Sequence, residues 1–198
     1  MAEIKSTMDM VLERAARMAA SAGEDDFSSE EKVREGMRLA AAYMRGEIGD
    51  VFAALAALPA PDHESARRGT VQSLLRNIFL PREAGPQQTA EKAMHGLVAI
   101  GRGDGQLLQV FAEMKKILDG YLQHRDQLKQ QLEAGFAQQM EMMEKNLARQ
   151  TGVAMKLQPS QHPKFQEEWA RVQSQLDDQY GRALGQLKEL VEQRLTSV

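Results

Sequence analysis

The sequence predicts an all-α fold: an N-terminal helical bundle (residues 1–105) followed by a long antiparallel helical hairpin (residues 106–198) with coiled-coil-like patterning. Three observations favour this fold class. Ala, Leu, Met, Gln and Glu, which are good helix formers, dominate the 198 residues, whereas β-branched residues are sparse. Glutamine occurs three times before Gly105 and seventeen times after it. Turn residues also become rare between Gly105 and Gly152, as a long helix requires.

Five helices are expected in the bundle, because start and stop signals recur along it. Ser6 and Ser28 are each followed three residues later by an acid, which is typical of a capping box at a helix start. Glycines follow the first two helices, and prolines stop the third and the fourth. The expected ranges are 6–22, 28–46, 48–58, 62–80 and 89–100.

The hairpin is predicted from a three-and-four spacing of apolar residues. The two expected helices cover residues 106–150 and 163–198, and Pro163 suits the first turn of the second. Arg125 interrupts the apolar seam of the first helix. That seam comprises Leu107, Phe111, Met114, Leu118, Tyr121, Leu128, Leu132, Phe136, Met143 and Leu147, and the second helix continues the rhythm through Phe165, Trp169, Val172, Leu176, Tyr180, Leu184, Leu187, Val191 and Leu195.

A register for the hairpin follows if Gln150 faces Pro163. Trp169 then lies near Glu144. In this register it packs in a tip cluster with Met140, Met143 and Leu147. Residues 107–117 extend past the end of the second helix, so we expect them to pack on the N-terminal bundle.

Charge and composition exclude several classes of protein. The net charge is −3, and the segments 1–61, 62–105 and 106–198 carry −4, +1 and 0, so no segment favours nucleic acid or an anionic membrane. The absence of cysteine excludes disulfides, thiolate nucleophiles and cysteine-bound metals. No signal peptide and no run of eighteen apolar residues is present. A cytoplasmic protein without a membrane span is expected.

Three stretches resemble a family of uncharacterised helical proteins of about 200 residues from proteobacteria. They are residues 2–7 (AEIKST) leading to 12–15 (LERA), residues 39–47 (LAAAYMRGE), and residues 163–169 (PKFQEEW). The resemblance implies a bacterial, cytosolic source. It implies no activity and no binding residues.

The four histidines lie on separate elements, so they do not suggest a metal site. His63 lacks the second histidine four residues on that a zinc-protease helix needs. No carboxylate–histidine spacing around His95, His124 or His162 suggests a metal. Surface or capping roles are expected, with a pH response of the hairpin through His124 as the alternative.

The glycine-rich stretch at residues 101–105 (GRGDG) is interpreted as a turn between two helices. A phosphate-binding loop would follow a strand and would carry a lysine, and neither condition holds. The alternative is an anion held by amides at the start of the next helix, with Arg102 nearby.

Basic, thioether and aromatic residues give the remaining candidates. Arg67, Arg68, Arg76 and Arg82 make the fourth helix the most basic element. Without aromatic platforms they favour a solvated face over nucleic-acid binding. Met140, Met142, Met143 and Met155 are assigned to core packing rather than to a soft metal, with Met142 pointing away from the seam. Trp169 is assigned to the seam or to a partner surface.

An internal similarity links residues 37–53 with residues 94–112. The first part recurs at an offset of 57, and the second part is displaced by two more residues. Similar alanine-rich helices explain it better than a true repeat.

The function predicted from these patterns is non-catalytic: a cytosolic scaffold or adaptor that acts through its hairpin. Flanking apolar positions such as Ile117, Leu122 and Leu190 would be covered by a second copy, so a homodimer with an unknown protein partner is expected. The alternative is a nucleic-acid-associated protein using the basic helix 62–80. No catalytic, cofactor-binding or metal-binding residue and no cofactor is predicted, and an enzyme is not expected.

Overall fold

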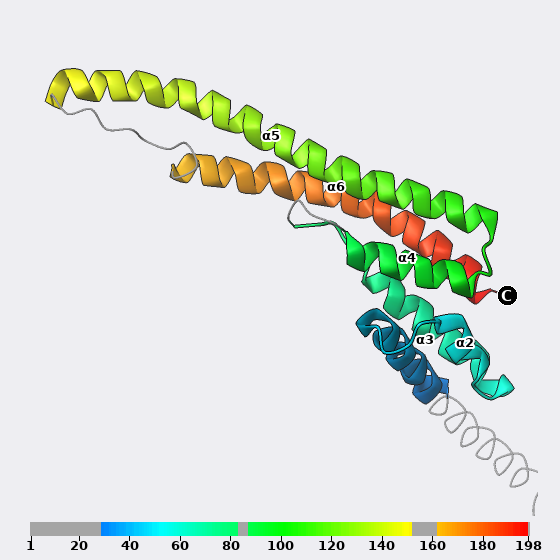
Figure 1. The fold of residues 1–198 in the computed structure, drawn as a ribbon. Helices are drawn as coiled ribbons and strands as arrows, with labels where there is room; N and C mark the ends of the chain where they lie inside the picture. The colour runs from blue at the N-terminus through cyan, green and yellow to red at the C-terminus, as the bar shows by residue number, and fades with distance from the viewer. Residues whose placement is uncertain (1–28, 83–86, 152–161, 198) are drawn as a thin grey trace, which may run out of the picture. The chain divides into compact units, whose positions relative to one another are not determined.

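The computed structural model describes residues 29–82, 87–151 and 162–197. Regular structure in these ranges is helical and includes no strand, which confirms the predicted all-α fold (Figure 1). The helix expected over residues 6–22 and the cap expected at Ser28 lie outside the described residues. None of the described helices combines the length and the apolar character needed to cross a membrane.

The helices follow the predicted order. The first described helix covers residues 29–45 and is followed by Gly46. The later elements are α2 (Val51–Ala56), the 3-10 helix η1 (Ala60–Asp62), α3 (His63–Arg76), α4 (Gln88–Ile100), α5 (Gly105–Thr151) and α6 (Pro163–Thr196). The 47 residues of α5 give it a length of about 70 Å at 1.5 Å per residue.

These elements form two compact units. The helical unit contains the described residues of 1–78, 89–104 and 192–198, and the hairpin unit contains those of 79–88 and 105–191. Polar contacts hold the last turns of α6 in the helical unit. Gln72 donates to Glu192 at 2.8 Å, and Arg194 pairs with Asp104 at 2.5 Å. The expected packing of residues 107–117 on the bundle stays a prediction.

Two glycines let the first described helix and α3 approach until their backbones touch. A Cβ atom on Gly36 would lie 1.8 Å from the carbonyl oxygen of Ala66, and one on Gly69 would lie 2.0 Å from that of Val33. The hydroxyl of Thr70, which is fully buried, lies 2.9 Å from the Gly36 carbonyl and 2.8 Å from the Ala66 carbonyl, so its proton is shared between them. Only glycine fits at both positions of this contact.

The first described helix and α4 end in the same Schellman motif. In α4 the amide of Gly103 donates to the Val98 carbonyl at 3.0 Å, and the amide of Arg102 donates to Ala99 at 3.1 Å. The left-handed position is Gly46 (φ 83°) in the first helix but Arg102 (φ 53°) in α4. This conformation costs a non-glycine residue about 1 kcal/mol. The two caps are one residue out of step with the 57-residue similarity, which agrees with similar helices rather than a repeat.

The helices α2 and α3 are shorter than predicted. α2 begins at Val51, because the Asp50 carboxylate accepts from the amides of Phe52 at 2.9 Å and of the next residue at 3.1 Å. α3 ends at Arg76, followed by a C-cap asparagine. Phe79 lies within the predicted range 62–80 but beyond the end of α3, so the predicted helix limit is wrong. Its side chain is 55% exposed, because the helical periodicity stops before it.

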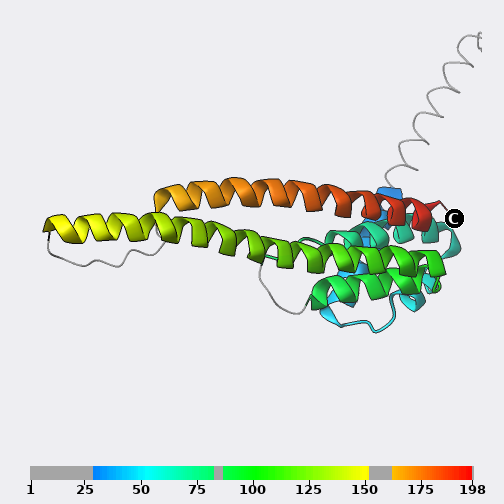
Figure 2. The same cartoon turned by 90° about the horizontal axis from the view of Figure 1, so that it is seen from above.

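In the hairpin unit α5 and α6 pack side by side and antiparallel (Figures 1 and 2). Phe136 on α5 meets Phe165 near the start of α6, with ring centroids 5.5 Å apart. Further along, Tyr121 meets Tyr180, with centroids 5.6 Å apart. These two ring pairs fix the register of the helices.

The observed register differs from the predicted one. Pairing Gln150 with Pro163 would place Phe165 opposite Ala148, whereas it contacts Phe136. Residues 137–151 therefore run about 22 Å beyond this contact. The eleven residues that follow can span about 36 Å, so no tight turn is needed at the end of α5.

The predicted tip cluster fails for the same reason. With Phe165 at Phe136, Trp169 lies one helical turn further along α6, opposite the region of Leu132 and away from Glu144. The side chains of Met143 and Leu147, which complete the predicted cluster, lie outside the description.

Burial along the predicted seam of α5 falls toward its distal half. The first five seam residues are buried: Leu107, Phe111, Met114, Leu118 and Tyr121. The next three, Leu128, Leu132 and Phe136, are only half-buried. The seam therefore follows the predicted rhythm, with a half-buried stretch from Leu128 to Phe136 before the buried Met140.

Candidate functional site

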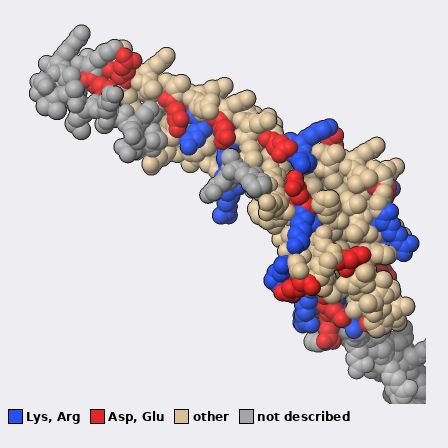
Figure 3. All heavy atoms as spheres, viewed as in Figure 1, with Lys and Arg blue, Asp and Glu red and all other residues tan. Residues whose placement is uncertain are grey.

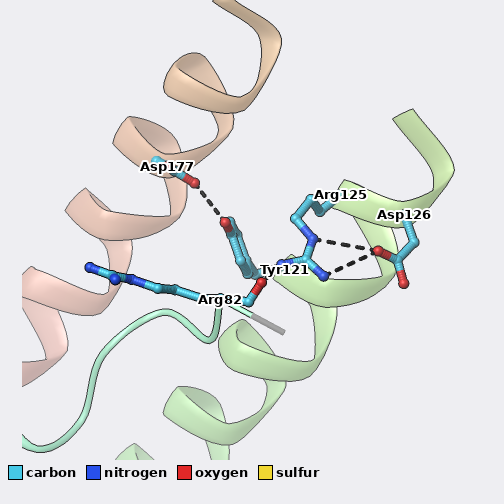
Figure 4. Close-up of polar contacts among 5 residues, drawn as sticks. All are labelled: Arg82, Tyr121, Arg125, Asp126 and Asp177. Atoms are coloured by element: carbon cyan, nitrogen blue, oxygen red, sulfur yellow. Dashed lines mark hydrogen bonds and ion pairs between the residues drawn. The ribbon is translucent and has the colours of Figure 1, made fainter. Parts of the chain in front are cut away.

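A layer of aromatic and polar side chains joins α5 to α6, and we call Tyr121, His124, Asp177 and Tyr180 the tyrosine layer. The Tyr121 hydroxyl donates to Asp177 Oδ1 at 2.7 Å (Figure 4). The rings of Tyr121 and Tyr180 meet edge to face, and His124 Nδ1 lies 3.5 Å from the Tyr180 hydroxyl. Edge-to-face pairs add about 1 kcal/mol beyond their buried area. The layer thus favours one register of the hairpin.

The chemistry of the layer is set by the protonation of Tyr121. Burial, together with the hydrogen bond to Asp177, raises the pKa of Tyr121 from 10.0 to about 12, although Arg125 acts in the opposite direction. The phenol therefore stays protonated at neutral pH and donates to the carboxylate. A group so far from its pKa is a poor general acid or base near pH 7.

Arg125 accounts for the polar break in the predicted seam. Its guanidinium donates to the backbone carbonyl of Arg82, and it pairs with Asp126 at 3.3 Å (Figure 4). It also lies 5.9 Å from the centre of the Tyr121 ring. The side chain therefore fastens the segment that contains Arg82 to α5, beside the tyrosine layer.

The four histidines do not come together, as expected. His63 Nε2 donates to the Leu58 carbonyl at 2.6 Å and so ties the start of α3 to the chain after α2. His162 accepts at Nδ1 from the amide two residues later, at the start of α6. His95 is exposed on α4, and His124 belongs to the tyrosine layer.

A second cluster, in the helical unit, consists of two arginines, Arg67 on α3 and Arg102 in the α4 cap. We call it the arginine pair. Arg67 Nε is buried without a hydrogen-bond partner in the described part of the chain. Burial, and after it the positive charge of Arg102, lower the pKa of the Arg67 guanidinium. The Arg102 guanidinium lies 5.3 Å from the centre of the Phe52 ring. The GRGDG stretch is thus a helix-to-helix turn whose arginine packs over the ring of Phe52.

The basic residues of the predicted fourth helix are dispersed. Arg67 is half-buried, while Arg68 and Arg76 are exposed on α3. Arg82 lies beyond the end of α3, and its side chain points away from Arg125 (Figure 4). On the face drawn in Figure 3, the described basic residues are interspersed with acidic ones. Of the three arginines on α3, only Arg68 and Arg76 are exposed.

The methionines behave as core and surface residues where their side chains are described. Met140 is buried, and Met142 is 69% exposed, which confirms that it points away from the seam. Met143 and Met155 lie outside the description. Among the described residues, no three histidine or acidic side chains gather as a metal site would require.

Sequence reasoning missed Asp177 and Phe52 as members of these clusters. Both contact residues that are distant in sequence, so the spacing of neighbouring residues does not indicate their role. Asp177 becomes a candidate only once the register places α6 beside Tyr121. Arg102 did carry a signal, because a charged residue flanked by glycines occupies the end of a helix.

The comparisons with known proteins give one family. The model described as "Family of unknown function (DUF6657)" matches residues 52–193. No curated protein and no solved structure matches the chain. The matched range begins in α2 and ends in α6, and it includes both the tyrosine layer and the arginine pair. The chain belongs to this family of unknown function, DUF6657.

Proposed function

We propose that the protein is a non-catalytic scaffold or adaptor that forms a homodimer through its hairpin unit. One observation carries the proposal. The exposed large hydrophobic residues of the described chain, Phe79, Leu108, Met142 and Leu190, all belong to the hairpin unit and none to the helical unit. Exposed apolar side chains that are confined to one unit support an interaction surface on that unit.

The packing of the hairpin supports the same proposal. A pair of helices has a narrow core, and the distal seam residues Leu128, Leu132 and Phe136 remain half-buried. A second hairpin would cover them, as in a four-helix arrangement. Two identical chains meet most simply through the same patch on each. A bacterial, cytoplasmic setting is part of the proposal and rests on the resemblance given above.

Light scattering tests the dimer with a matched pair of variants. The wild-type protein should have twice the chain mass of 22.1 kDa. Replacing Leu108 and Leu190, which are 49% and 48% exposed, by glutamine should shift the protein toward 22.1 kDa without loss of helix. The control replaces the exposed neighbours Gln109 and Gln186 by alanine and should stay dimeric. A wild-type mass of 22.1 kDa would refute the proposed dimer.

The adaptor role is tested with a shortened hairpin. Replacing residues 127–174 by a short glycine-serine loop keeps the Tyr121–Asp177 and His124–Tyr180 contacts and removes the distal part. We expect this variant to stay folded and to lose the partner captured by the wild-type chain. Capture that is unchanged would assign binding to another part of the protein.

The nucleic-acid alternative rests on Arg68 and Arg76, which are exposed on α3 and have no ion pair with the described residues. It predicts salt-sensitive retention of DNA or RNA that is lost when both are replaced by glutamine. Retention that survives these substitutions, or none at low salt, would reject it.

A further inference from the structure

Beyond Leu128 the distal part of α5 carries two lines of uncharged residues. One line continues the seam with a spacing of four, through Leu132, Phe136, which meets α6 at Phe165, and the buried Met140. A spacing of four turns this line around the helix by about 40° at each step. The positions that keep the heptad spacing are therefore left outside the contact with α6. Four of them are exposed: Gln131, Gly135, Gln138 and Met142.

Together with Leu128 these positions form a continuous line on α5, which we call the heptad stripe. Leu128 at one end is half-buried, and Met142 at the other end is 69% exposed. Gln131 and Gln138 form no hydrogen bond with the described residues. A Cβ atom on Gly135 would meet nothing within 4 Å. The described chain thus leaves this face of α5 open.

The chemistry of the heptad stripe is nearly the same when it is read in either direction. An apolar residue stands seven positions on each side of Gly135, and a glutamine stands four positions before it and three after it. An identical helix that runs antiparallel across a two-fold axis at Gly135 sets Leu128 against Met142 and Gln131 against Gln138. A glutamine amide both donates and accepts, so two opposed glutamines form hydrogen bonds with each other. The stripe is therefore complementary to itself.

We propose that the heptad stripe binds the same stripe of a second copy, antiparallel, with the two-fold axis at Gly135. This contact rests on the homodimer proposed above and specifies the face at which the two hairpins meet. Gly135 has no side chain, so the two α5 helices approach most closely at the axis. No like charges meet beside the stripe, because the flanking positions are uncharged: Gln127, Leu132, Ala134 and Gln139.

Charged substitutions at Gln131 and Gln138 test the contact by light scattering of the full chain. In Gln131→Lys/Gln138→Lys each introduced lysine faces an introduced lysine of the second copy. We expect at least about tenfold weaker dimerisation and a shift toward 22.1 kDa. In Gln131→Lys/Gln138→Glu each introduced lysine faces an introduced glutamate, so the dimer should persist. Both positions are exposed on α5, so circular dichroism should show no loss of helix in either variant.

The matched control is Gln123→Lys/Gln130→Lys. It adds the same charge at two exposed positions seven residues apart and outside the stripe, and it should stay dimeric. A dimer that survives Gln131→Lys/Gln138→Lys but not the Leu108 and Leu190 substitutions would overturn this contact and leave the proposed homodimer standing. Loss of the dimer in the lysine–glutamate variant would overturn the antiparallel arrangement. A wild-type mass of 22.1 kDa would refute the homodimer and this contact with it.

Disulfide cross-linking examines the same arrangement without added charge. The chain has no cysteine, so introduced cysteines have no competitor. Oxidation of a mixture of Gln131→Cys and Gln138→Cys chains should give disulfide-linked dimers, because the antiparallel stripes bring these two positions together. Either variant alone should give few, since its two cysteines then lie about 10 Å apart along the helices. A yield from each variant alone that equals the yield from the mixture would overturn the proposal.

Discussion

The buried phenol of Tyr121 on α5 donates a hydrogen bond to Asp177 on α6 at 2.7 Å, across 56 residues of sequence. The bond joins one residue of each helix, so sliding α6 along α5 by a turn would break it. It would also separate the Tyr121 and Tyr180 rings. Polar groups within an apolar seam often specify register in this way.

A double-mutant cycle measures this contact. Tyr121→Phe and Asp177→Ala should each destabilise the protein, with a coupling free energy of about 1 kcal/mol in urea unfolding. The matched control cycle pairs Tyr121→Phe with Asp178→Ala, an exposed neighbour, and should show no coupling. Equal coupling in both cycles would mean that the hydrogen bond does not hold the helices in register.

The phenol of Tyr121 should lose its proton only at high pH. The folded pKa of Tyr121 is raised to about 12 from 10.0, so between pH 10 and pH 12 the unfolded chain loses this proton while the folded chain keeps it. Stability should therefore fall as the pH rises through this window, and Tyr121 should add no pH dependence below it. Absorbance of tyrosinate after rapid pH jumps should show a step near pH 12 that is missing in Tyr121→Phe. A step that persists in the variant would contradict the assignment.

The glycine contact in the helical unit should not accept a methyl group. Gly36→Ala places a Cβ within 1.8 Å of the Ala66 carbonyl oxygen, so the helices must separate, and we expect a loss of at least about 2 kcal/mol in urea unfolding. Gly135→Ala in α5 is the control. Its Cβ meets nothing within 4 Å, and alanine favours a helix by about 1 kcal/mol, so stability should rise. Similar losses in both variants would contradict the close approach.

Cross-linking distinguishes the observed register from a tight-turn register. The chain has no cysteine, so two introduced cysteines can be joined without competition. A short bis-maleimide should join Phe136→Cys to Phe165→Cys within one chain, because these rings are in contact. It should not join Ala148→Cys to Phe165→Cys, the pair that the tight-turn register brings together. Cross-linking of the 148/165 pair but not of the 136/165 pair would instead support the tight-turn register.

Helix limits and buried faces were largely readable from sequence, because capping residues and apolar spacing act locally. The residues from Leu107 to Tyr121 on the seam are buried as predicted, and α5 and α6 begin within a residue of their predicted starts. The predicted helix 62–80 runs about one turn past the end of α3, and it therefore includes Phe79, which is exposed. Extending a periodic pattern past a helix end turns an exposed residue into an apparent core residue.

The register and the clusters could not be read in the same way. An apolar seam repeats every few residues, so it matches its partner almost equally well after a shift of a heptad. The length of the connecting loop then decides the register of the two helices, and a long loop permits several registers. Tyr121 and Asp177 supply what the seam lacks, since their hydrogen bond forms in one register only.

The close approach of the two helices at Gly36 and Gly69 also bears on where the domain begins. The family match starts at residue 52, so it includes Gly69. It does not include the first described helix, which packs against α3 at Gly69. A glycine within α3 has no advantage unless another backbone lies against it. Relatives that retain glycine at this place should therefore carry a helix upstream of the matched range, with a glycine of its own facing α3. In a comparison of such sequences, this pair of glycines would then place the start of the domain before residue 52, where the family match begins.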